Sequence, residues 1–212
     1  MPMPTPRPFR ALIVGAMLVL ALLVAAPAAA DTTPFNVQSQ THEAIAAYTV
    51  SDACSVTFVF VDATNYLIQN LGSSTGLTSL TTIAVDVNGY NSCTGTGINA
   101  FFFGPASVSF AVAGNLGSAS LQATVPLFDS VSGQSLTAVL NLSWTATGSS
   151  FFFNSSGGGH FGSCTVADSQ NQIRRSASLS GTVTVNGTNL APSANQEAFI
   201  AFQEGGQVNV HC

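Results

Sequence analysis

Residues 72–76 carry the first candidate for chemistry. They read Gly-Ser-Ser-Thr-Gly, the spacing of a nucleophile elbow, with Ser74 in the position of the nucleophile. Asp168 and His211 follow in the order that the acid and the base have in one class of hydrolase. That motif needs a strand that turns sharply into a helix, whereas residues 77–87 have the composition of a strand. We therefore expect an ordinary Ser/Gly turn, and Ser74 stays as the nucleophile of an alternative hydrolase hypothesis.

Two further sets of side chains could bind a metal or cleave a sugar linkage. His160, Cys164, His211 and Cys212 offer the two nitrogens and two sulfurs of a tetrahedral zinc site, but their spacing is not that of a zinc finger. We expect no metal and no other cofactor.

Pairs of acidic residues, such as Asp62 with Asp86, could hydrolyse a glycosidic bond if the fold brought them to a suitable separation. We expect the nine scattered acids to be solvated turn residues. The alternative hydrolase could therefore use Ser74 or an Asp/Glu pair.

The most informative pattern is a pair of phenylalanine triplets, residues 101–103 and 151–153. In a strand the central ring points away from its two neighbours, so both faces of each segment are apolar. Burying one ring is worth about 2–3 kcal/mol, so we expect the core and an overlying loop to cover both segments. The alternative is an aromatic platform for a ligand or partner. Its rings would be Phe101, Phe103, Phe151 and Phe153.

The first thirty residues have the features of a secretory signal. Arg7 and Arg10 precede an apolar run at 11–26, and Pro27 is followed by three alanines that suit a signal peptidase. The alternative is an uncleaved membrane anchor. Cleavage after the third alanine would leave residues 31–212 as one secreted domain without a membrane span.

All four cysteines lie after residues 1–30, and an even number in an exported chain predicts two disulfides. Three pairings are open. We favour Cys54 with Cys93 and Cys164 with Cys212, because each bond then closes a loop within one half of the chain. A loop near forty residues is worth roughly 4 kcal/mol in the chain-entropy model.

Short runs of β-branched and aromatic residues, at 55–61, 106–112, 140–144 and 182–185, predict strands with one buried and one wet face. No convincing amphipathic helix follows the signal.

Turn residues separate these runs. Asn88-Gly89 and Asn186-Gly187 predict type I′ hairpins. Residues 114–117 and 204–206 resemble longer hairpin loops. Pro126 and Pro192 cannot donate to a ladder, so each should mark an edge or a strand end. On the order of a dozen strands would give an antiparallel β-sandwich or a closed β-barrel.

The charge balance limits the classes of partner. Hydrophobic residues make up 46% of the chain and charged residues only 6%. After residue 30 there are two arginines, no lysine and nine acids, which excludes a protein that binds the phosphates of nucleic acid or anionic lipid. We expect a secreted, non-catalytic binding or surface-interaction module for polysaccharide or another cell-envelope component. The alternatives are the hydrolase above and a disulfide-stabilised protein inhibitor.

Overall fold

The computed structural model describes residues 35–70, 78–161, 164–192 and 196–211, all within one compact unit, residues 33–211. These residues form ten strands and no helix, as the alternating sequence runs predict. The strands are β1 (Phe35–Ser51), β2 (Ser55–Asn70), β3 (Thr78–Asn91), β4 (Thr96–Pro105), β5 (Ser109–Val112), β6 (Ser118–Asp129), β7 (Gln134–Phe161), β8 (Cys164–Val185), β9 (Thr188–Asn189) and β10 (Gln196–His211).

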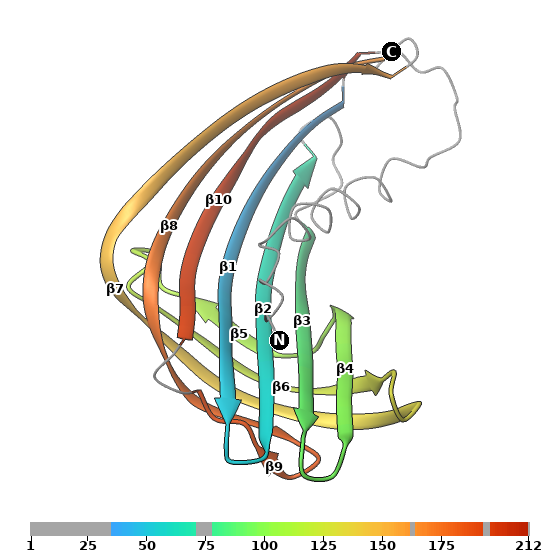
Figure 1. Ribbon diagram of the computed structural model, residues 1–212. Coiled ribbons are helices and arrows are strands. Elements are labelled where there is room, and N and C mark those ends of the chain that lie inside the picture. Colours follow the sequence, from blue (N-terminus) through green and yellow to red (C-terminus); the bar gives the residue numbers. More distant parts are fainter. Residues whose placement is uncertain (1–34, 71–77, 162–163, 193–195, 212) are drawn as a thin grey trace, which may run out of the picture. The chain divides into compact units, whose positions relative to one another are not determined.

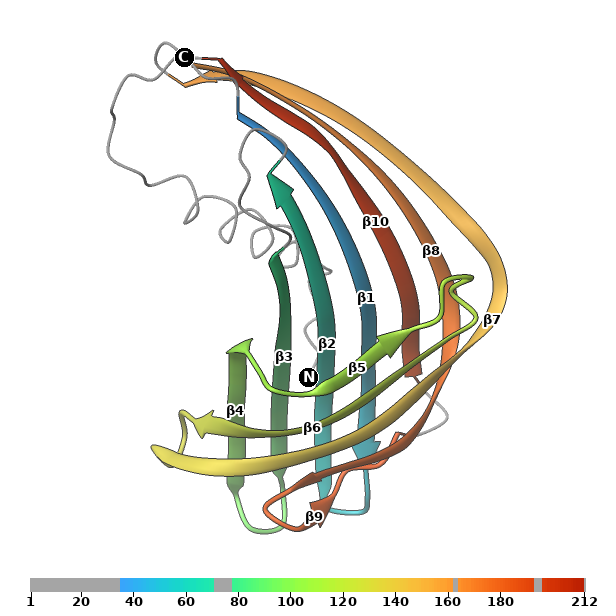
Figure 2. The same ribbon diagram turned by 180° about the vertical axis from the view of Figure 1, so that it is seen from behind.

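All strand pairs are antiparallel and belong to one sheet. Neighbouring pairs run in the order β10-β1-β2-β3-β4-β6-β7-β8, and β8 also pairs with β10, so these strands form a ring. The join between β4 and β6 has two residue pairs, Ala100 with Asp129 and Phe101 with Phe128. Strands β5 and β6 and the first part of β7 cross β1–β4 at a steep angle in a second layer (Figures 1 and 2).

The core lies between these two layers. Strand β6 shows why: its residues are alternately exposed and buried along its whole length, so one face is apolar and the other is wet. Trp144 of β7 is fully buried, and its indole N–H donates to the carbonyl oxygen of Ile45 in β1 at 2.9 Å. The Tyr48 hydroxyl donates to the carbonyl oxygen of Leu190 at 2.8 Å. We call the sheet face turned away from this core the outward face.

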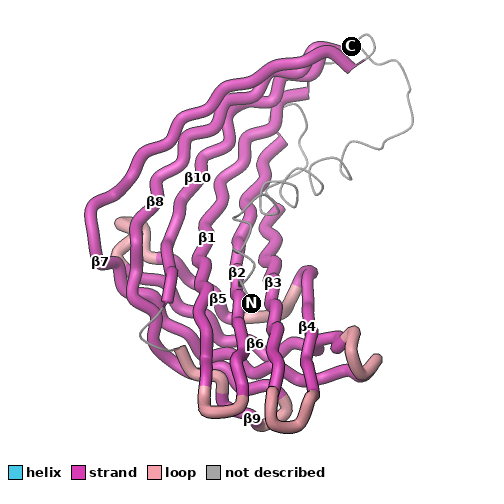
Figure 3. The backbone as a smooth tube through the Cα atoms, viewed as in Figure 1, coloured by secondary structure: helices cyan, strands magenta, loops and turns pink. Residues whose placement is uncertain are grey.

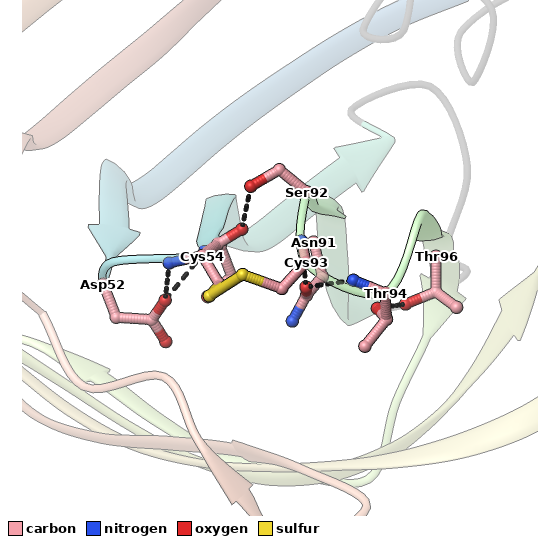
Figure 4. The surroundings of a disulfide bond; sticks show 8 residues. Asp52, Cys54, Asn91, Ser92, Cys93, Thr94 and Thr96 are labelled. Atoms are coloured by element: carbon pink, nitrogen blue, oxygen red, sulfur yellow. Dashed lines mark hydrogen bonds between the residues drawn. A yellow bond between two sulfur atoms is a disulfide. The ribbon is translucent and has the colours of Figure 1, made fainter.

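The disulfide between Cys54 and Cys93 is confirmed and joins two neighbouring turns (Figure 4). Asp52 prepares the first turn, because its carboxylate accepts hydrogen bonds from the backbone N–H groups of Cys54 and Ser55. Asn91 prepares the second turn in the same way, through the N–H groups of Cys93 and Thr94. The carboxyl pKa of Asp52 lies below its ordinary value because these N–H groups stabilise its charge. Cys212 lies outside the described residues.

The Asn88-Gly89 hairpin prediction is wrong. Both residues lie inside β3, and the chain turns after Asn91 instead. Gly89 has a different reason for its small size: a Cβ there would lie 2.7 Å from the Thr57 hydroxyl oxygen. The other Asn-Gly pair is a turn as predicted, with φ of 47° at Asn186 and 83° at Gly187.

Two of the remaining turn predictions have opposite outcomes. Residues 114–117 join β5 to β6, and Leu116 takes a positive φ of 52° there. Residues 204–206 lie inside β10, where the pairing with β8 shifts register after Gly205 instead of reversing the chain. Pro126 lies in the part of β6 that pairs only with β7, which is the edge position expected for proline.

Several strands are longer than the expected short runs. Strand β7 has 28 residues and β8 has 22. A register shift between Ala146 and Ser150 lets β7 bend and continue (Figure 3). Arg175 stabilises the bend, because its guanidinium donates to the carbonyl oxygens of Gly148 and Asn115. The described residues include no helix that could span a membrane.

Candidate functional site

The two phenylalanine triplets lie in strands, but the structure does not bring them together. Residues 101–103 are in β4, and residues 151–153 are in β7, beyond the part of β7 that pairs with β6. Phe102 packs against the core. The four rings of the predicted platform are exposed to between 50% and 65%, so they are not covered in the way that their burial energy predicted. They are Phe101, Phe103, Phe151 and Phe153.

An exposed aromatic surface extends over the outward face of β2, β3, β4 and β6. The cross-strand register places Phe60, Asp86, Phe101 and Phe128 directly opposite one another in one row. The rings of Phe101 and Phe128 meet edge to face, with their centroids 6.0 Å apart. We call this surface the aromatic face, and its exposed members are Phe58, Tyr90, Phe101, Phe103 and Phe128.

Polar side chains share the aromatic face. Asp86 lies between Phe60 and Phe101 in the row, and it accepts a hydrogen bond from the Asn88 amide at 2.6 Å. Partial burial raises the pKa of Asp86, and the Asn88 hydrogen bond opposes that shift. The next row pairs Asn88 with Phe58 on one side and with the exposed Asn99 on the other. Hydrogen-bonding groups therefore alternate with flat rings on one surface.

A set of carboxyl groups continues this outward face toward β1. Across the β2–β3 pair, Asp62 lies opposite Ala84, so Asp86 is its diagonal neighbour. Across the β1–β2 pair, Asp62 lies opposite Ile45, so Glu43 is its diagonal neighbour on the other side. Diagonal neighbours across strands are about 7–8 Å apart. We call Glu43, Asp62 and Asp86 the carboxyl diagonal. The predicted pair Asp62 and Asp86 is thus brought close together, and Glu43 is a member that the sequence did not indicate.

The environment of the carboxyl diagonal raises its pKa values. Burial, followed by the nearby charge of Asp62, raises the pKa of Glu43 to about 8, and Arg174 opposes this shift. Burial raises the pKa of Asp62 to about 6, although the Thr64 hydroxyl donates to its carboxylate at 2.8 Å. Near neutral pH the two carboxyl groups together therefore retain a proton more readily than ordinary carboxyl groups do. Such a pair can donate one hydrogen bond and accept another.

The two arginines among the described residues, Arg174 and Arg175, lie on opposite faces of β8, as the alternation of a strand predicts. The guanidinium of Arg174 lies 3.2 Å from the ring centre of Phe199, a cation–π contact on the outward face. The other arginine, Arg175, supports the bend in β7. They do not form a shared anion site.

The remaining candidates lie near one end of β7, β8 and β10 or outside the described residues, and His160 and His211 pair with Thr165 from its two sides. Ser74 lies outside the described residues, Asp168 is in β8 and His211 is in β10. Of the predicted zinc ligands, His160 contacts the Thr165 hydroxyl at 3.2 Å. Within the described ranges no cluster of three or more His, Cys, Asp or Glu could hold a metal ion.

Comparison with known proteins adds no template for this site. No family model, no curated protein and no solved structure matches the chain. The chemistry of the outward face is therefore argued from its own residues.

Proposed function

We propose that the protein is a secreted, non-catalytic binding module whose aromatic face takes a neutral polysaccharide of the cell envelope or its surroundings. The observation that carries this proposal is the row in which Phe60, Asp86, Phe101 and Phe128 lie side by side. The apolar C–H faces of a sugar ring pack on aromatic rings, and sugar hydroxyls donate to carboxylate and amide oxygens.

The charge of the same face selects between ligand classes. Asp86 and Asp62 contribute negative charge, and Arg174 is the cation near the carboxyl diagonal. An anionic polymer would meet repulsion there, whereas a neutral chain of sugars would not. Rings exposed along an open sheet face also suit an extended polymer better than a small ligand, which needs an enclosing pocket.

Export and the finer architecture belong to the same proposal. Residues 1–30 act as the signal, and the Cys54–Cys93 bond suits an oxidising compartment. We place a second disulfide between Cys164 and Cys212. In support, Thr165 of β8 pairs with His211 of β10, and each of these residues is next to one of the two cysteines in the sequence. We regard the ring of strands as a flattened barrel, because hydrogen-bonded pairs link its neighbours around the ring.

Retention of the purified protein on neutral polysaccharides, measured by affinity electrophoresis and pull-down on insoluble glycans, tests the proposed ligand. The double variant Phe101→Ala, Phe103→Ala should bind roughly tenfold more weakly, because it removes two exposed rings from the aromatic face. Val139→Ala shortens an exposed apolar side chain of β7 outside the aromatic face and should bind like the unaltered protein. The proposal fails if no neutral polysaccharide is retained, or if both variants lose the same affinity.

One observation favours a second function, acid–base hydrolysis by Glu43 and Asp62. Their pKa values of about 8 and about 6 leave one proton donor and one base between them near neutral pH. Activity would then rise as Asp62 loses its proton and fall as Glu43 does. Glu43→Gln should abolish release of reducing ends from the bound polysaccharide while retention on it persists. If the unaltered protein releases none, the pair has no catalytic role.

A further inference from the structure

The outer part of β7 is an unusually long open edge. Strand β6 pairs with β7 as far as Thr145, whereas residues 150–161 pair with β8 on one side and with no described residue on the other. Figures 1 and 3 show this part of β7 as the margin of the sheet. Alternate residues along this twelve-residue stretch thus present backbone N–H and C=O groups that can accept another strand.

This edge lacks the features that normally prevent pairing between molecules. Residues 150–161 read Ser-Phe-Phe-Phe-Asn-Ser-Ser-Gly-Gly-Gly-His-Phe and contain no lysine, no acidic residue and no proline. The register with β8 is continuous from Ser150 to Phe161, so no bulge turns the edge away.

The exposure of the triplet indicates what kind of partner would cover it. Phe151 and Phe153 lie opposite Arg174 and Gln172 on the outward face, and Phe152 lies opposite Ile173 on the other face. All three rings are more than 60% exposed, and Phe152 reaches 74%. A ligand on one face would leave part of the triplet in water. A strand added at the edge brings side chains to both faces at once.

The segment is complementary to itself. In an antiparallel pair, a residue whose N–H and C=O groups point to the partner strand lies opposite a residue whose groups also do so. When the two strands are identical, directly opposite residues therefore both have odd numbers or both have even numbers. One such register centres on Ser155 and sets Phe151, Phe152 and Phe153 opposite the glycines at 159, 158 and 157 of the second copy. Each ring then covers a bare glycine backbone, an arrangement that stabilises cross-strand pairs.

We propose that the protein forms a two-fold dimer in which residues 150–160 of β7 pair antiparallel with the same residues of a second copy, Ser155 facing Ser155. The eleven pairs join two sheets into one and cover six phenylalanine rings. The interface is independent of the aromatic face on β2, β3, β4 and β6.

Substitutions that place a charge at Ser155, the residue on the two-fold axis, test this interface. Sedimentation velocity over a wide range of concentration should show a reversible dimer of the unaltered protein. Ser155→Lys and Ser155→Glu each set like charges directly opposite, so each alone should raise the dimer dissociation constant by about tenfold or more. Mixing the two variants should restore dimers, because opposite charges then meet.

Ser143→Lys is the matched control, since Ser143 is an exposed serine of the same strand that pairs with both β6 and β8. It should dimerise like the unaltered protein, and circular dichroism should show every variant folded. A monomer at all concentrations would overturn the proposal, as would dimers that Ser155→Lys leaves intact or that mixing fails to restore. Loss of dimers in Ser143→Lys would place the interface elsewhere.

Discussion

At the scale of single residues, Glu43 shows how neighbours change an ordinary carboxyl group. Its own strand context, between His42 and Ala44, indicates nothing unusual. Burial in the folded sheet is the larger cause of its raised pKa, and the register of β1 and β2 adds the charge of its diagonal neighbour Asp62. Both effects favour the protonated form, so the pKa rises.

These shifts predict that stability falls as pH rises. The folded protein holds the protons of Glu43 and Asp62 more tightly than the unfolded chain does, so ionisation favours unfolding. The free energy of unfolding should be higher near pH 5 than near pH 8, with most of the fall due to Glu43, whose pKa moves from 4.5 to about 8. Urea denaturation across this range measures it.

Glu43→Gln is the control for this pH dependence, because the amide keeps the shape and removes the ionisation. Its stability should change much less between pH 5 and pH 8. An equally steep fall in the variant would show that other groups cause it.

At the scale of elements, the two Asn-Gly pairs show that a turn signal is conditional. Residues 186–187 form a turn and residues 88–89 do not, although both pairs suit a type I′ hairpin. Residues 88–89 remain in β3 because the chain can turn a few residues later, where Asn91 caps the turn and Cys93 bonds to Cys54. Local propensity was outweighed by a cross-link between two turns that are neighbours in space but 39 residues apart in the sequence.

Removing the Cys54–Cys93 disulfide should lower the free energy of unfolding. The double variant Cys54→Ala, Cys93→Ala opens a loop with a sequence separation of 39, which the chain-entropy model values at about 4 kcal/mol. We expect the urea midpoint to fall accordingly, with strand content in circular dichroism unchanged below the transition. A loss under about 1 kcal/mol would mean that the Asp52 and Asn91 hydrogen bonds hold the two turns without the disulfide.

At the scale of the whole described unit, two crossing layers enclose one core. Trp144 links them, since its ring is buried among side chains of both layers and its N–H reaches the backbone of β1. Replacing it removes packing from the centre and leaves the Ile45 carbonyl oxygen without that donor.

Trp144→Phe should therefore lower the free energy of unfolding by about 2–3 kcal/mol. Urea denaturation followed by circular dichroism measures the loss. Val139→Ala, on the outward face of the same strand and 45% exposed, should cost well under 1 kcal/mol, roughly a surface effect. Equal losses in the two variants would contradict the central place of Trp144.

The sequence by itself determined the β class and the antiparallel pattern, and it favoured the Cys54–Cys93 bond among three open pairings, which the structure then confirmed. The alternation of side chains and the turn residues are local properties of the sequence, and they have the same effect wherever a chain buries one face of a strand. The sequence offers Asp62 with Asp86 only as one of several possible acidic pairs. Which acids lie close together depends on the pairing of strands that are far apart in the sequence.

Only the tertiary structure decided which side chains share a surface. The register of β1 through β4 aligned Glu43, Asp62 and Asp86 and built the aromatic face, and the bend of β7 carried its triplet to an open edge. Cross-strand register depends on the summed packing of the whole sheet, since each residue pair contributes little. The chemistry of the outward face is therefore a property of the assembled sheet.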